Sequence, residues 1–133
     1  MQFETTTLRT VALSGVGLHG GLPASVRIRP ARSAAGIVFC RTDLDGFRIP
    51  ANGEYVARVS YATSLMRQGV LISTTEHLLS VLYSLGIDNA QVEVDNLEVP
   101  ILDGSGQSFV EHLNRAGRKL LRRKRRYLQI RRP

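Results

Sequence analysis

Hydrophobic and polar positions alternate with a period of two over much of the N-terminal half of the chain. The clearest case is residues 24–29, where Val26 and Ile28 alternate with Arg27 and Arg29. This alternation is typical of a half-buried antiparallel strand. Other stretches rich in β-branched residues predict strands over residues 5–13, 36–42, 70–73 and 90–94, with one or two more within 55–66.

The period changes to that of a helix at residue 73. Ser73, Thr74, Thr75 and Glu76 have the form of a helix capping box, and apolar residues then recur at spacings of three and four until Gly86. A second helix is predicted over about 107–116, before Gly117. We therefore predict an α+β fold: a two-layer sandwich of a mixed, mostly antiparallel sheet with two helices packed on one face.

Composition agrees with one soluble domain. The chain has 133 residues, of which 43% are hydrophobic and 22% charged, the ordinary balance of a globular protein. Its single cysteine, Cys40, cannot form an internal disulfide, and no signal peptide or apolar run of roughly 18 residues is present. We expect a cytoplasmic protein without a membrane span.

The net charge of +7 is confined to one end of the chain. Residues 115–133 hold ten of the 18 Lys and Arg and no acid, whereas residues 1–114 carry eight basic and eleven acidic side chains, a net charge of −3. A basic end of this kind fits a solvated linker, and it also fits a tail that contacts nucleic acid or anionic lipid. After it, residues 127–130 resemble the opening of another strand.

Glu76 and His77 are the leading candidates for chemistry. In the first turn of a helix, the free amides and the helix dipole favour an ionised carboxylate and oppose protonation of an imidazole. A neutral imidazole can bind a metal ion, and a neighbouring carboxylate can accept a proton from water. The simpler alternative is that Glu76 completes the capping box and His77 is a half-exposed helix residue.

Two further polar residues lie in glycine-rich turns. His19 belongs to a segment with four glycines between residues 14 and 21, and it could reach a ligand or simply face solvent. Asp103 precedes Gly104 and could orient another catalytic group or form an ordinary turn.

His112 is interpreted as a surface residue and Cys40 as a packed one. None of the three histidines is paired at i, i+4 with another histidine or an acid, so a complete metal site within this chain is not expected.

Taken together, three stretches resemble a known family. SGVGLHGG, GIVFCRTDL and the long segment from ISTTEHLL to SFVEHL follow one another as in the zinc-dependent UDP-3-O-acyl-N-acetylglucosamine deacetylases of lipid A biosynthesis in Gram-negative bacteria. The resemblance implies removal of the N-linked acetyl group of the UDP-linked, O-acylated glucosamine by a zinc-activated water.

The resemblance also implies roles for individual residues. Glu76 matches the general base and His77 one of three Zn²⁺ ligands. His19 and Leu18 match the loop at the edge of the active site, where His19 is a candidate for catalysis and both are candidates for substrate binding. Asp103 matches the acid of a Leu-Asp-Gly motif with a supporting catalytic role.

The family's second domain, which carries the other two zinc ligands in a His-x-x-x-Asp pair, has no counterpart here. We therefore expect residues 1–117 to be the N-terminal domain, and 118–133 a basic linker with a possible first strand of a missing C-terminal domain. The 133-residue chain alone is expected to be an inactive monomer that binds no nucleic acid. The alternative is a stand-alone binding module whose basic tail contacts nucleic acid or anionic lipid.

Overall fold

The centre of the protein is a five-stranded sheet. A computed structural model describes residues 2–133. The strand order is β2-β3-β9-β4-β5, and every neighbouring pair is antiparallel except β4 and β9, which are parallel. These strands are β2 (Val11–Val16), β3 (Pro23–Pro30), β4 (Ile37–Arg41), β5 (Phe47–Pro50) and β9 (Ala90–Val94). The predicted mixed, mostly antiparallel sheet is confirmed.

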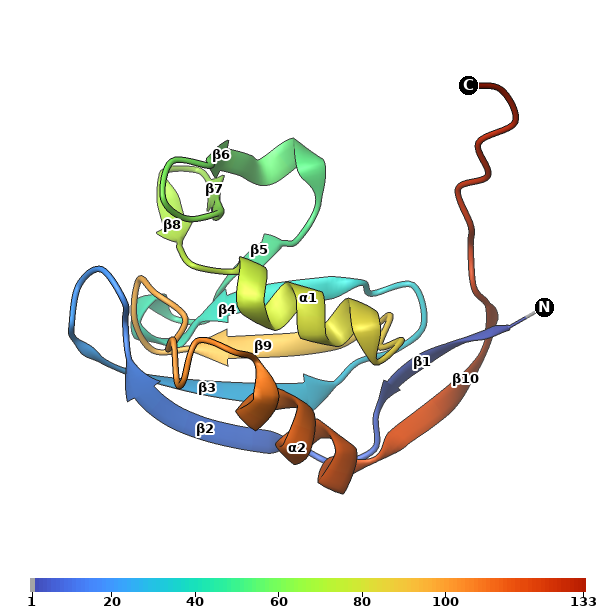
Figure 1. Ribbon diagram of the computed structural model, residues 1–133, viewed down its shortest axis with the longest axis horizontal. Helices are drawn as coiled ribbons and strands as arrows, with labels where there is room; N and C mark the ends of the chain where they lie inside the picture. Colours follow the sequence, from blue (N-terminus) through green and yellow to red (C-terminus); the bar gives the residue numbers. More distant parts are fainter. Residues whose placement is uncertain (1) are drawn as a thin grey trace.

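Two helices, α1 (Glu76–Ser84) and α2 (Gln107–Ala116), cover one face of this sheet (Figure 1). The alternation in β3 places Val26 and Ile28 in the core, where both are fully buried. Leu78 and Leu82 of α1 and Phe109 and Leu113 of α2 meet the sheet there, with at most 1% of each exposed. Burying such side chains contributes roughly 1.5–3 kcal/mol each, so the apolar spacing that predicted the helices also explains why they pack on the sheet.

A smaller antiparallel sheet follows β5 in the chain. It consists of β6 (Val56–Arg58), β7 (Ser64–Arg67) and β8 (Val70–Ile72), in that order. Short 3₁₀ turns at Thr42–Leu44 and Gly53–Tyr55 flank β5. The buried Arg41 of β4 is held by both carboxylate oxygens of Asp43 and donates to the Leu71 carbonyl, which ties the small sheet to the large one.

Three strands of the structure differ from the sequence prediction. The single strand expected over residues 5–13 is divided into β1 (Phe3–Thr7) and β2, which belong to different sheets. Strand β5 was not predicted, because its four residues include Arg48 and end at Pro50, too short a stretch to show alternation.

The basic end is also more ordered than a solvated linker. Residues 118–124, expected to be a linker, form β10 (Arg118–Lys124), which pairs antiparallel with β1 to make a two-stranded ribbon. Glu4 of β1 lies 3.5 Å from the guanidinium of Arg123, so the ribbon pairs opposite charges. Residues 125–133 have no regular secondary structure, including the stretch 127–130 that resembled a strand. The proposed domain boundary after residue 117 stays a prediction.

Among residues 2–133, no helix is long and apolar enough to cross a membrane.

Candidate functional site

The start of α1 brings Glu76 and His77 together at the surface. Nε2 of His77 lies 4.0 Å from Oε1 of Glu76, and about a third of each side chain is exposed. The other oxygen of Glu76 accepts a 3.0 Å hydrogen bond from the backbone N–H of Thr63, in the connection between β6 and β7. The carboxylate is thereby fixed at one of its two oxygens.

The predicted capping box is wrong. Thr75 precedes the first residue of α1 but makes no capping hydrogen bond with its side chain; its hydroxyl donates to the Thr63 carbonyl instead. Ser73 pairs with the hydroxyl of Ser64, 3.0 Å away. Thr74 adopts a left-handed backbone conformation (φ 57°) and turns toward Glu98. Partners from elsewhere in the fold have displaced the local pattern that the sequence suggested.

The glycine-rich segment forms the loop between β2 and β3, as expected from its flanking strands. The Gly17 N–H donates to the Leu22 carbonyl and the Gly21 N–H to the Gly17 carbonyl, which closes a compact turn. Leu18 is 56% exposed, and 44% of the His19 side chain is exposed. Both residues lie at the tip of the loop, where they are accessible to a ligand.

Glu98 receives most of the polar contacts of this loop. Its carboxylate accepts hydrogen bonds from the backbone N–H groups of His19 and Gly20, at 3.0 and 3.1 Å, and from the Thr74 hydroxyl at 2.8 Å. Nδ1 of the His19 ring lies 3.0 Å from the same carboxylate. Only 10% of the Glu98 side chain is exposed.

These contacts determine the charge of Glu98. Burial raises the pKa of the Glu98 carboxyl, but the hydrogen bonds from the loop amides, the Thr74 hydroxyl and the His19 ring lower it by more than burial raises it. The resulting pKa is about 2, so the carboxylate is ionised at neutral pH.

Gly17 makes room for this carboxylate. A Cβ atom at position 17 would lie 2.4 Å from Oε2 of Glu98, closer than real Cβ atoms approach. The same atom at position 20 would lie 3.6 Å away, at ordinary contact distance. Gly17 is therefore required by space and not by backbone conformation.

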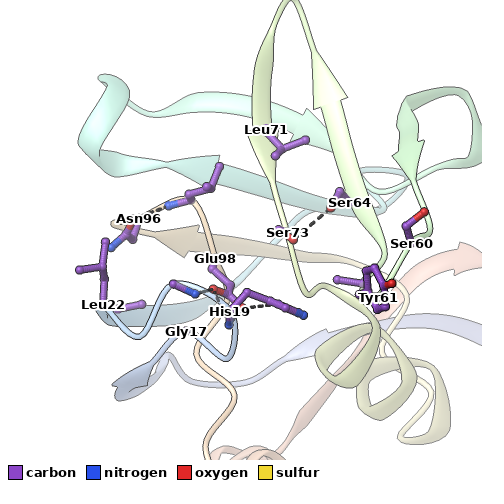
Figure 2. Close-up of a pocket in the computed structure, with 14 residues that line it drawn as sticks. Gly17, His19, Leu22, Ser60, Tyr61, Ser64, Leu71, Ser73, Asn96 and Glu98 are labelled. Carbon is purple, nitrogen blue, oxygen red and sulfur yellow. Dashed lines mark hydrogen bonds and ion pairs between the residues drawn. The ribbon is translucent and has the colours of Figure 1, made fainter.

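A cavity of about 440 Å³ opens between this loop and the small sheet (Figure 2). His19 and Glu98 line it from below, Leu71 and Ser73 from β8 and its end, and Tyr61 from the β6–β7 connection. Glu76, His77, Leu18 and Asp103 do not line it. The structure thus joins His19 to a cavity and places the Glu76–His77 pair beside the same β6–β7 connection.

Asp103 stands apart from these residues. Its carboxylate accepts hydrogen bonds from the hydroxyl and the backbone N–H of Ser105, at 2.6 and 3.0 Å. The Ser105 hydroxyl and amide hold the pKa of Asp103 below its usual range. The contacts shown here are those of a turn that leads into α2, and the supporting catalytic role of Asp103 stays a prediction.

Cys40 is packed, as interpreted from the sequence, and His112, interpreted as a surface residue, is partly buried. Cys40 is 3% exposed within β4, and burial raises the pKa of its thiol. His112 lies 2.7 Å from the Ser108 carbonyl of its own helix, at Nδ1.

Glu98 is the residue that the sequence analysis missed. It lies in the segment 97–102, LEVPIL, where it is the only charged residue among apolar ones. An acid in such a run is a signal, because burying a carboxylate without partners is costly and natural proteins supply the partners.

No group of three or more His, Cys, Asp or Glu residues within 2–133 is arranged to hold a metal ion. The residues present fit a zinc site in part: His77 offers an imidazole that is about one-third exposed, and Glu76 lies next to it.

Residues 4–133 match the family model described as LpxC: UDP-3-O-acyl N-acetylglycosamine deacetylase. Three curated relatives carry the name UDP-3-O-acyl-N-acetylglucosamine deacetylase. The protein from Solibacter usitatus is 70% identical over 133 residues, which are 100% of this chain and 45% of the relative.

The relative from Nautilia profundicola is 43% identical, covering 96% of this chain and 43% of its own length. The relative from Geotalea uraniireducens is 42% identical, covering 100% of this chain and 44% of its own length. The matched residues include this chain's whole α+β domain, in which α1 begins with a glutamate–histidine pair. The chain belongs to the LpxC family of deacetylases, and it spans less than half the length of these relatives.

Proposed function

We propose that the chain is the N-terminal part of a zinc-dependent hydrolase that removes the N-acetyl group from UDP-3-O-acyl-N-acetylglucosamine in lipid A biosynthesis. The observation that carries the proposal is the match over residues 4–133 to the deacetylase family, in a chain whose α1 begins with an exposed glutamate–histidine pair. The proposal includes a C-terminal domain of the same enzyme as partner, a cytoplasmic location and a monomeric state.

In this proposal, each named residue has a chemical task. His77 would hold Zn²⁺ through Nε2, together with ligands from outside this chain. A bound zinc ion supplies Lewis acidity and lowers the pKa of water. Glu76 accepts the proton of the water that attacks the acetyl carbonyl, and its hydrogen bond from the Thr63 amide keeps one oxygen fixed while the other is open. His19 and Leu18 contact the substrate at the loop tip, and Asp103 supports the site.

The stand-alone binding module is not favoured. Two of the basic side chains near the end are already matched with acids of the body, Arg123 with Glu4 and Arg125 with Asp88 at 2.9 Å. These contacts fit a segment that packs against its own domain and leave less free charge for nucleic acid or anionic lipid.

A fusion protein tests the proposed activity. Residues 1–133 would be joined to the remaining C-terminal part of the Solibacter usitatus relative, and acetate release from UDP-3-O-acyl-N-acetylglucosamine would be measured with and without a chelator. We expect activity that the chelator removes and that His77→Ala abolishes. A fusion that folds and is inactive, or that is equally active with His77→Ala, would contradict the proposal.

The chain by itself tests the partial zinc site. One imidazole and one carboxylate should bind zinc weakly, because tight sites use three or four protein ligands. We expect substoichiometric zinc by metal analysis after dialysis. Tight, stoichiometric zinc in the 133-residue protein would show that the site is complete without a second domain.

A further inference from the structure

Glu98 contacts the loop 17–22, which carries Leu18 and His19, and it contacts Thr74, two residues before the Glu76–His77 pair. We infer that Glu98 is a positioning residue: it fixes the His19 ring with its proton on Nδ1, keeps Nε2 free for a ligand in the cavity, and binds the loop to the start of α1. The link to deacetylation rests on the proposed function, whereas the state of the ring does not.

The contact geometry determines the tautomer. An ionised carboxylate only accepts hydrogen bonds, so the 3.0 Å contact between Nδ1 of His19 and Oε1 of Glu98 requires a proton on Nδ1. In a neutral ring, Nε2 then carries the lone pair. The depressed pKa of Glu98, about 2, supports a permanently ionised acceptor.

The free nitrogen belongs to the side of the ring that lines the cavity. Figure 2 shows the His19 ring extending from the loop toward the side of the cavity where Tyr61 lies, with Glu98 behind it. The surrounding wall is largely apolar, with Leu22, Leu71 and Leu97. An imidazole nitrogen held as an acceptor in a largely apolar wall suits a ligand that donates a hydrogen bond, such as a sugar hydroxyl.

The same carboxylate reaches the other segment through Thr74. The Thr74 hydroxyl donates to Oε1 of Glu98 at 2.8 Å, the oxygen that also contacts His19. Thr74 holds a left-handed backbone conformation, φ 57°, which a β-branched residue rarely adopts, so its orientation is determined by tertiary contacts. Glu76 follows two residues later. A single buried group therefore ties the His19 loop to the segment that leads into Glu76.

The tautomer can be measured directly in the 133-residue chain. Long-range ¹H–¹⁵N correlation spectra of the histidine rings, recorded at about pH 8 where histidine is ordinarily neutral, distinguish a proton on Nδ1 from one on Nε2. We expect His19 with the proton on Nδ1. In Glu98→Ala, the His19 ring nitrogens should shift toward a mixture of both tautomers.

Glu93→Gln is the matched control. Glu93 is another carboxylate with little exposure, and it is paired with Arg29 at 2.8 Å. Its substitution should leave the His19 signals unchanged. Glu98→Gln preserves the size of the side chain and should speed exchange of the Nδ1 proton with water several-fold, because the acceptor loses its charge. A wild-type proton on Nε2 would overturn the inference, even if Glu98→Ala does not fold. Unchanged His19 signals in a folded Glu98→Ala would also overturn it.

The effect on activity is tested in the fusion protein described above. If Glu98 acts through His19, then Glu98→Ala and His19→Ala each lower kcat/KM by about 10- to 100-fold, and the double variant is no worse than the poorer single one. Multiplied losses in the double variant would contradict action through His19. An inactive wild-type fusion would count against the proposed function alone, because the ring spectra decide the positioning role separately.

Discussion

Glu76 and Glu98 are two carboxylates near the start of α1, and they are held in opposite ways. Glu98 is nearly buried, accepts hydrogen bonds from two backbone amides and a hydroxyl, and contacts an imidazole. Glu76 is about one-third exposed, and a single hydrogen bond, from the Thr63 amide, reaches it from the described residues. The buried group has almost no freedom, whereas the exposed one has an open oxygen.

The difference separates positioning from chemistry. A proton acceptor must exchange its proton with a reactant, so it needs an accessible oxygen and few fixed donors. A positioning group needs the reverse, because its value lies in always making the same contacts. Substitutions at Glu76 should therefore affect activity more than stability, and substitutions around Glu98 should affect both.

The largest expected effect is that of Glu76→Gln on catalysis. In the fusion protein, loss of the proposed proton acceptor should lower kcat by on the order of 10²–10⁴-fold. The free energy of unfolding of the 133-residue chain should change by less than about 0.5 kcal/mol, as for other exposed positions. Glu111→Gln, on the exposed side of α2, is the control and should leave kcat unchanged. Wild-type activity in Glu76→Gln would remove Glu76 from the mechanism.

The next effect is the response of stability to acid. Because folding depresses the pKa of Glu98 from 4.5 to about 2, the stabilisation is fully present above the unfolded value and is lost as pH falls between these two values. The shift corresponds to about 3 kcal/mol. Urea denaturation over this pH range should show the wild type approaching Glu98→Gln in stability as pH falls. A constant gap between wild type and Glu98→Gln over this pH range would contradict the assignment.

Gly17→Ala should have a smaller effect on stability. The new methyl group would overlap Oε2 of Glu98 and force the carboxylate or the loop to move, at a cost of about 2 kcal/mol. Gly20→Ala, in the same loop, places its methyl group at an ordinary contact distance and should cost much less. Equal thermal stability of the two variants would show that the loop does not hold Glu98 tightly.

Thr74→Val is expected to have the smallest effect. It removes one hydrogen bond to an ionised acceptor and preserves the branched shape, so the chain should lose about 1.5 kcal/mol. Thr42→Val is the control, because the Thr42 hydroxyl makes only a long contact of 3.4 Å at the surface. The difference is measured by chemical denaturation of both variants, and equal losses would show that the Thr74 hydroxyl adds no more stability than the long contact of Thr42.

The sequence predicted the parts of the fold whose pattern is local. Alternation identified β3, and spacings of three and four identified α1 and α2, because in each case one face is buried against a common core. Strand β10 was missed for the opposite reason. Its polar and basic residues show no alternation, and it forms a strand because β1, from the other end of the chain, supplies the partner.

The candidate site also has a part that the sequence identified and a part that it did not. Glu76 and His77 were accessible to sequence reasoning because they are neighbours, and the resemblance gave them their proposed roles. The contacts of Glu98 join it to His19 and Thr74, which lie 79 and 24 residues away in the chain. No local sequence pattern predicts such long-range contacts, although the isolated acid in LEVPIL indicates that Glu98 needs polar partners.

The pairing of β1 with β10 also matters for the order in which the protein is made. Residue 3 pairs with residue 124, so nearly the whole chain lies between the two strands. On the ribosome, β1 is synthesised before β2 to β9 and β10 is synthesised after them, and closing so long a loop is slow. The five-stranded sheet and both helices can therefore assemble while the edge of β1 that pairs with β10 is still unpaired. Nascent chains are most exposed to wrong strand pairing in that interval.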